Sequence, residues 1–293
     1  TLTEDLDLSY RAQMAGWRFA YLDDVRVPAE IPDTVAGLEV QQRRWAQGGV
    51  QTGRKILPAL LRGPWSWAVK FEGVVHLFGH LAHPLTWALA LLLFPSAVAR
   101  RSLGLEHILW VDLVLFTAAT VPFVVFYWMA GELRGRPRQG RLRAVLRTLA
   151  LGIGLSIPVS RAVLRGMRTS NDPFERTPKR GEGAGAGYAA QVLAPDVACK
   201  LLMAALMTAY ALAAVAGGYW GQLPFILLFL SGYAALGVPA LRGRLLPDEE
   251  NDLAHEESET GEPQSRPRRR RLQPLATLLV RPEPEIADEC EAA

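Results

Sequence analysis

The sequence predicts a mixed fold: a short α/β region, then an all-α transmembrane bundle with an interfacial helix, then a disordered tail. Two observations carry this prediction. Hydrophobic residues make up 50% of the 293 residues, yet charged residues still reach 21%. The two classes are also segregated, with apolar stretches in the middle and polar ends. This segregation favours a membrane protein with soluble ends over a single globular core.

Residues 1–53 are expected to form the α/β region. A helical pattern ends at Gly16, and its apolar face is made by Leu6, Tyr10 and Met14. Aromatic side chains then alternate with other residues over positions 17–21, which predicts a half-buried strand. A second helix is expected to start near Thr34. The residues that it places on one face are Gln41, Arg44 and Trp45.

Four apolar stretches are each close to the ~20 residues that a bilayer core requires. They are residues 74–98, 108–131, 195–217 and 222–241. A soluble helix would show a polar stripe at helical period, and residues 89–94 and 225–230 show none. Residues 63–241 are therefore predicted to be a transmembrane region with about four spans. Residues 242–293 are too polar to bury a core and are predicted to be a disordered cytoplasmic tail.

The arginines predict the orientation of the spans. The segment between the second and third spans carries Arg134, Arg136, Arg138, Arg141, Arg143 and Arg147. Basic loops favour the cytoplasmic side, so both ends of the chain are expected in the cytoplasm, with the cell inner (plasma) membrane as the location. Residues 141–168 have basic flanks and are predicted to lie along the cytoplasmic interface, with a re-entrant segment as the alternative.

Four side chains of the polar start suit the chemistry of an activated sugar. Arg44 offers a planar fork of donors to a diphosphate, and Trp45 offers a flat surface to a sugar ring. Gln41 can donate to hydroxyls and accept from them. Asp5, near a helix start, is expected to stay ionised and to accept a proton. An ordinary helix cap and an ordinary exposed helix face are the alternatives for these two groups.

The residues Thr3-Glu4-Asp5 and Gln41-Gln42-Arg43-Arg44-Trp45 resemble the TED and QxxRW motifs of processive family-2 glycosyltransferases, which include cellulose, mannan, chitin and hyaluronan synthases. Residues 3–49 resemble the bacterial cellulose-synthase-like and glucomannan-synthase-like branch throughout. The resemblance implies that residues 1–62 are the carboxyl-terminal part of a GT-A glycosyltransferase domain plus an interfacial helix. It implies Asp5 as the base that deprotonates the acceptor. The residues implied to bind acceptor and diphosphate are Glu4, Gln41, Arg44 and Trp45.

A third motif lies between the interfacial helix and the last two spans. Residues 174–181 resemble the FxVTxKxG gating loop of cellulose synthases, although Arg176 replaces the valine. Within a loop of residues 169–187, the residues implied to close over a bound nucleotide are Phe174, Arg176, Thr177 and Lys179. A basic interfacial linker is the alternative.

The family also uses an upstream aspartate and a DxD pair, which holds the divalent metal, Mg²⁺ or Mn²⁺, that bridges the diphosphate. Both of these family motifs precede the TED motif and would lie before Thr1. The metal ligands are therefore expected outside this chain. The chain is expected to be a carboxyl-terminal fragment that is inactive alone.

A polar stripe interrupts the first apolar stretch. Glu72, His76 and His80 are spaced one helical turn apart, and with Trp87 they are predicted to line the path of a polymer. A three-histidine metal site of His76, His80 and His83 is the alternative, but no strong fourth ligand or supporting shell is evident.

The expected function is an inverting glycosyltransferase that polymerises a β-linked polysaccharide from a nucleotide-activated hexose and translocates it across the membrane. Its partners would be the nucleotide-sugar donor, the growing polysaccharide acceptor and the lipid bilayer. The formal net charge of +3 is too small to indicate nucleic-acid binding. The alternatives are a non-processive enzyme that moves a single sugar to a lipid carrier, and a non-catalytic membrane module.

Overall fold

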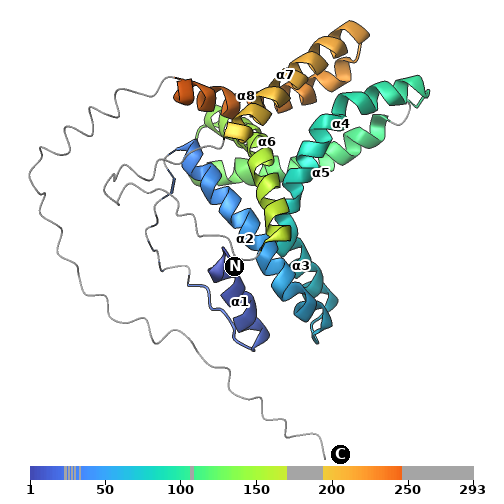
Figure 1. Ribbon diagram of the computed structural model, residues 1–293. Helices are drawn as coiled ribbons and strands as arrows, with labels where there is room; N and C mark the ends of the chain where they lie inside the picture. The colour runs from blue at the N-terminus through green and yellow to red at the C-terminus, as the bar shows by residue number, and fades with distance from the viewer. Residues whose placement is uncertain are drawn as a thin grey trace, which may run out of the picture.

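The computed structural model describes residues 1–22, 34–105, 109–169 and 194–245, with scattered positions between 25 and 32. Regular structure in these parts is helical. In chain order the elements are α1 (Glu4–Met14), α2 (Val35–Arg62), α3 (Trp67–Phe78), η1 (Gly79–Leu81), α4 (Ala82–Ser102), α5 (Leu109–Leu133), α6 (Arg138–Arg168), α7 (Ala194–Gly217), η3 (Trp220–Gln222) and α8 (Leu223–Leu245). Figure 1 shows α6 in the centre, with α1 and α3 running along α2 and with α7 and α8 paired.

Helix α1 forms as predicted and ends at Met14, and the turn that follows contains Gly16, whose φ of 88° is a conformation that favours glycine. Residues 17–22 have no regular structure, and Phe19 and Tyr21 are exposed. A strand is stabilised by pairing with a neighbour, and the described parts of the chain contain no partner strand. The strand predicted for residues 17–21 is therefore not observed, and the α/β character of this region stays a prediction.

Helix α2 is the platform on which several other helices pack. It starts after Thr34, whose hydroxyl accepts a 3.0 Å hydrogen bond from the backbone N–H of Gly37 and so caps the helix. Residues 47–53 are buried on all sides. Glycine makes this possible: a Cβ added to Gly53 would lie 3.0 Å from the ring of Phe78 in α3. The polar second helix predicted from sequence is thus largely enclosed.

Among the described residues, five helical segments are long and apolar enough to cross a membrane, which indicates a membrane protein. They are Trp67–Ser102, Phe116–Leu133, Arg138–Arg168, Pro195–Gly217 and Trp220–Arg242. Four of them correspond to the four apolar stretches found in the sequence. The fifth is α6, a helix that the sequence places along the interface. That placement stays a prediction.

Helix α6 is enclosed through close backbone contacts. A Cβ added to Gly154 would lie 2.6 Å from the carbonyl oxygen of Gly232 in α8. One added to Gly166 would lie 2.7 Å from the carbonyl oxygen of Gln47 in α2. Small residues let helices approach this closely. The centre of the bundle is completed by the buried side chains of Ile157, Val159 and Val163.

The first segment of membrane length is broken in its middle. Helix α3 ends at Phe78, and the short turn η1 leads into α4, whose first turn contains Pro84. Irregular backbone at membrane depth is tolerated where it is buried in protein or lines a wet cavity. Here the break packs on α2, since a Cβ added to Gly49 would lie 3.5 Å from the His80 ring. Of the polar stripe predicted from the sequence, His80 therefore lies in this break, and Glu72 and His76 lie on α3 before it.

Candidate active site

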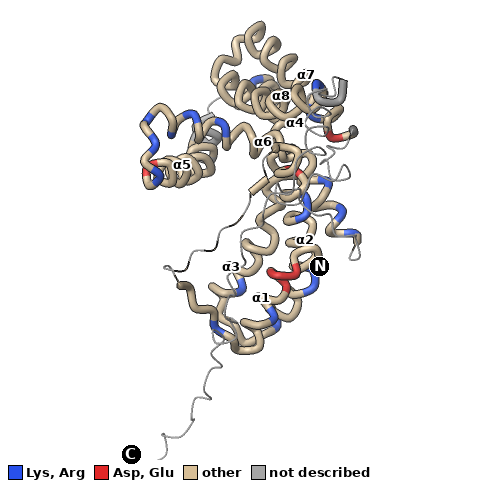
Figure 2. The backbone as a smooth tube through the Cα atoms, turned by 90° about the vertical axis from the view of Figure 1, so that its left-hand side faces the viewer, with Lys and Arg blue, Asp and Glu red and all other residues tan. Residues whose placement is uncertain are grey.

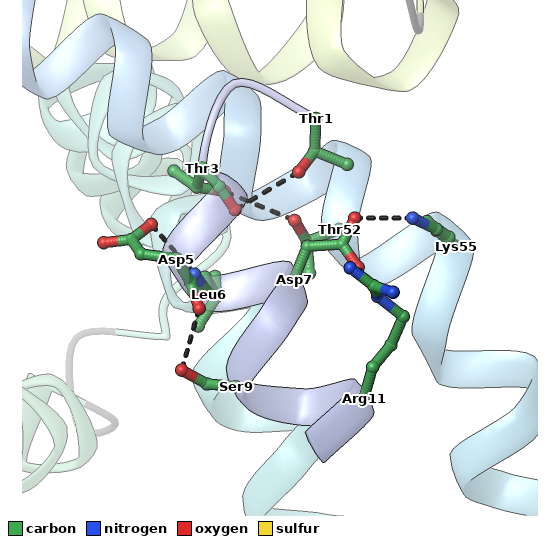
Figure 3. A network of polar contacts seen from close by, with 9 residues as sticks. All are labelled: Thr1, Thr3, Asp5, Leu6, Asp7, Ser9, Arg11, Thr52 and Lys55. Carbon is green, nitrogen blue, oxygen red and sulfur yellow. Dashed lines mark hydrogen bonds and ion pairs between the residues drawn. The ribbon is translucent and has the colours of Figure 1, made fainter. Parts of the chain in front are cut away.

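Two aspartates of α1 lie in different environments (Figure 3). Asp5 is exposed, and its Oδ1 accepts a 2.8 Å hydrogen bond from the backbone N–H of Leu6. Asp7 is buried, and its carboxylate oxygens accept from Arg11 at 2.9 Å and from Lys55 of α2 at 2.6 Å. Burial opposes ionisation, but the hydrogen bonds and charges of Lys55 and Arg11 hold the pKa of Asp7 below its ordinary value. Asp7 therefore anchors the helix, and Asp5 remains open to a ligand.

The start of α1 is fixed to α2 around Gly48. The backbone N–H of Leu2 donates to Gln51 Oε1 at 3.1 Å, and the hydroxyls of Thr3 and Thr52 are 3.2 Å apart. A Cβ added to Gly48 would lie 2.6 Å from Thr3 Cγ2, so glycine leaves the space that Thr3 occupies. Thr3 makes no side-chain cap to α1. Its side chain instead seats α1 on α2, which argues against the ordinary capping alternative.

The predicted binding face of α2 is helical throughout, so Gln41, Arg44 and Trp45 share one side of it. Gln41 and Arg44 are half-buried, and Trp45 keeps 42% of its surface exposed. The adjacent Ala46 is fully buried against α6. This arrangement anchors the helix on one side and leaves the indole accessible on the other.

The two predicted motifs lie on helices that are packed together. Trp45 is three residues before Gly48, the position at which α2 receives Thr3. Glu4 and Asp5 are exposed in the turn that follows Thr3. The convergence of Asp5 with Arg44 and Trp45 around one substrate stays a prediction.

Buried charges fix α2 to α7. Glu39 and Lys200 form an ion pair at 2.5 Å, and their side chains are 3% and 1% exposed. Arg161 of α6 pairs with Asp196, near the start of α7, at 2.6 Å. Glu39 lies two residues before Gln41 and so on the other side of α2, and the pair therefore fixes the helix that carries the predicted binding face to α7. The pair has no signal in the local sequence, because its members are 161 residues apart.

The residues of the gating-loop motif, Phe174, Arg176, Thr177 and Lys179, lie outside the described residues. The helix that precedes them is tied to α2 at its end. Gln51 Nε2 donates to the carbonyl oxygen of Thr169 at 3.2 Å, and Arg54 donates to that of Gly166 at 3.0 Å. Gln51 therefore contacts both the start of the chain and the end of α6, a role that nothing in its sequence context indicates.

The polar stripe of the broken helix is connected to α1. The Tyr10 hydroxyl lies 2.9 Å from His76 Nδ1, and burial and the negative charge of Glu72 raise the pKa of Tyr10. The rings of His80 and His83 are stacked with centroids 6.2 Å apart. Sequence analysis assigned Tyr10 to the apolar face of α1 and missed this contact. The predicted path through Glu72, His76, His80 and Trp87 stays a prediction.

The described residues do not offer a metal site. No group of three His, Cys, Asp or Glu side chains among them is placed to hold an ion. In particular, His76, His80 and His83 of the first membrane segment do not form such a group. The divalent metal implied by the resemblance therefore has no ligand set among the described residues.

Comparison with known proteins identifies related sequences. Residues 1–131 match the family described as "Glycosyl transferase family group 2". Glucomannan 4-beta-mannosyltransferase 1 of Oryza sativa subsp. japonica is 35% identical over 102 residues, which cover 33% of this chain and 20% of that protein. Glucomannan 4-beta-mannosyltransferase 7 of Arabidopsis thaliana is 28% identical over 149 residues, which cover 50% of this chain and 24% of that protein.

The chain therefore spans about a quarter or less of the length of these curated relatives. No solved structure shows a significant match. The matched residues include both predicted motifs, the seat of α1 on α2 and the broken first membrane segment. Residues 1–131 are therefore similar to family-2 glycosyltransferases, and the relatives named above are glucomannan 4-beta-mannosyltransferases.

Proposed function

We propose that the protein carrying this chain is an inverting glycosyltransferase that polymerises a β-linked polysaccharide from a nucleotide-activated hexose and moves the product across the membrane. The observation that carries this proposal is the seating of α1, the helix of Asp5, on α2, the helix of residues 41–45. The broken first membrane segment packs on the same stretch of α2. This arrangement supports a reaction centre next to a membrane passage.

In the proposed reaction an acceptor hydroxyl attacks the anomeric carbon of the donor sugar. The new C–O bond forms as the bond to the diphosphate oxygen breaks, the configuration inverts, and the hydroxyl proton passes to the carboxylate of Asp5. The exposure of Asp5 supports this role, because Asp7 is already bound by two cations. Positioning of this carboxylate against the acceptor hydroxyl would supply its contribution to the rate.

The remaining motif residues are proposed to hold the two substrates. Arg44 would bind the diphosphate through its planar fork of donors, and the exposed face of Trp45 would stack on a sugar ring. Glu4 and Gln41 would hydrogen-bond acceptor hydroxyls. The proposed loop that closes over the nucleotide contains Phe174, Arg176, Thr177 and Lys179.

The polymer is proposed to pass along the broken segment. Glu72, His76 and His80 supply polar groups along α3 and η1. Trp87 Nε1 is buried and has no hydrogen-bond partner among the described residues, so it is a donor that a sugar hydroxyl can satisfy. The relatives' names support a polymer product, since they are glucomannan mannosyltransferases.

The proposed topology places both ends of the chain in the cytoplasm of a cell with the protein in its inner (plasma) membrane. The turn between α5 and α6 is rich in arginine, which favours the cytoplasmic side. The turn of residues 218–221, between α7 and α8, carries no charge and suits the outer side. An enzyme that transfers a single sugar to a lipid carrier would require no polar path through the membrane helices. The polar stripe of Glu72, His76 and His80 therefore favours the polymerase.

Polymer synthesis by the full-length protein in membranes tests this proposal. With radiolabelled nucleotide-hexoses as donors, the wild type should form a high-molecular-weight product. Asp5→Asn and Trp45→Ala should each nearly abolish it while the protein remains inserted in the membrane. Persistent synthesis in Asp5→Asn would exclude Asp5 as the base. A product that consists of one sugar on a lipid would favour the alternative enzyme.

The matched control is the neighbouring aspartate. Asp7→Asn removes a carboxylate two residues away from Asp5 and breaks the anchor to Lys55 and Arg11. It should lower thermal stability, and activity measured well below the melting temperature should survive better than in Asp5→Asn. Equal losses of activity in the two variants at matched amounts of folded protein would remove the distinction drawn between the two aspartates.

A further inference from the structure

The turn between α5 and α6 carries a basic and apolar surface that the proposed function does not use. Its arginines are exposed at Arg134, Arg136, Arg138, Arg143 and Arg147. Figure 2 shows Lys and Arg positions gathered around this turn, beside α5. The nearby acid Glu132 is paired with Arg141 at 3.0 Å and so does not neutralise the other arginines. The surface therefore has a strong positive charge and is suited to bind an anionic partner.

The same surface exposes large apolar side chains. Leu133 is 88% exposed at the end of α5, and Leu142 and Leu146 are each more than half exposed on α6. Leu142 and Leu146 are four residues apart, and so are Arg143 and Arg147, so leucines and arginines form adjoining stripes on one face of the helix. The side of the helix away from the arginines is used for packing, since Val145, two residues from both Arg143 and Arg147, is buried. Leucines beside arginines suit a partner that is anionic at its surface and apolar beneath it.

The order of residues along α5 matches the layers of a bilayer. Residues 121–126 are apolar, Tyr127 and Trp128 follow, and the arginines come after Leu133. Arg141 lies over the Trp128 ring at 5.5 Å, which joins the aromatic level to the basic level. Aromatic side chains prefer the interface, and basic side chains beyond it reach lipid headgroups. The comparable turn between α7 and α8, at residues 218–221, has no charged residue.

We propose that the exposed arginine and leucine surface of the α5–α6 turn is a docking site for anionic phospholipid headgroups. The arginines would bind the phosphates of the lipid, and Leu142 and Leu146 would enter the upper acyl region. Each basic residue close to a membrane surface contributes roughly fivefold in affinity. Loss of three arginines should therefore weaken binding on the order of a hundredfold.

The test uses the purified chain in a neutral detergent and needs no sugar donor, so it is independent of the proposed enzyme activity. Phosphatidylglycerol and phosphatidylcholine are titrated separately, and native mass spectrometry reports the dissociation constant of the first bound lipid. The wild type should prefer phosphatidylglycerol, and added salt should weaken that preference. The triple variant Arg136→Gln/Arg138→Gln/Arg143→Gln should lose the preference while its binding of phosphatidylcholine stays unchanged.

A control variant with the same change in charge separates a local site from general attraction. Arg18, Arg62 and Arg242 are exposed and lie away from the turn in the sequence, so Arg18→Gln/Arg62→Gln/Arg242→Gln should keep the preference. All five arginine positions at the turn are exposed, and circular dichroism should report the same helix content in both triple variants. Equal binding of both lipids by the wild type, or equal losses in the two triple variants, would overturn the proposal.

Discussion

Removal of one member of the buried ion pair between α2 and α7 should destabilise the helical bundle strongly. Lys200→Met keeps much of the side-chain volume but removes the ammonium that donates to Glu39 Oε2 at 2.5 Å. The Glu39 carboxylate is 3% exposed, and its Oε1 already has no hydrogen-bond partner among the described residues. An uncompensated buried charge of this kind costs about 3–5 kcal/mol. We expect Lys200→Met to lower the free energy of unfolding by that amount.

The double variant Glu39→Leu/Lys200→Met separates the two charges from the packing. It removes both desolvation costs, so its stability should lie close to that of the wild type. The coupling between the two substitutions should then exceed about 2 kcal/mol. An exposed pair is the control: Glu132 is 60% exposed and pairs with Arg141, so Glu132→Gln should cost less than about 1 kcal/mol.

Unfolding of the purified chain in detergent micelles, followed by far-UV circular dichroism, measures these differences. The four chains of the double-mutant cycle and the exposed control are compared under one condition. The reasoning is refuted if Lys200→Met is as mild as Glu132→Gln. It is also refuted if the double variant loses as much stability as the two single variants together.

Two further predictions concern the seat of α1. Gly48→Ala should lower the free energy of unfolding by about 1–3 kcal/mol, because the added Cβ meets Thr3 at 2.6–2.8 Å. The control is Gly152→Ala, which should be neutral or stabilising because nothing lies within 4 Å of its added Cβ. Equal unfolding midpoints for these two variants would contradict the close approach. The pKa of Asp7 is lowered in the folded state, so its stabilisation is present above its ordinary pKa and is lost as the pH falls through the folded value. In a plot of the unfolding midpoint against pH, Asp7→Asn should therefore lose less stability at acid pH than the wild type does. Parallel losses in the two proteins would refute the role of Asp7.

The elements that sequence analysis predicted well are those whose signals are local. Helix α1 has its apolar face and its terminal Gly16 within one short segment, and α2 has its cap at Thr34. The four long apolar stretches are each recognisable from a single window of sequence. Resemblance to known motifs then singled out Asp5 and Trp45. None of these inferences needed to know which helices pack together.

The features that were missed depend on residues far apart in the chain. Asp5 and Asp7 look alike in sequence, and the difference between them comes from Lys55, which is 48 residues beyond Asp7. The interior of α6 looks short and flanked by arginines, yet Gly154 and Gly166 let it approach α8 and α2 at backbone distance. A glycine gives no periodic signal for such an approach. The structure, and not the sequence pattern, therefore identifies the helices that enclose α6.

One short stretch of α2 connects the proposed chemistry to the proposed passage. Residues 47–53 receive Thr3 of α1 at Gly48, the broken membrane segment at Gly49 and the end of α6 at Gln51. Close-packed contacts of this kind transmit displacement, because the interior has little free volume to absorb it. A rotation of α2 would thus move the helix that carries Asp5 and the break that carries the polar stripe together. In a polymerase, the attack on each sugar and the advance of the chain would then be linked through this single helix.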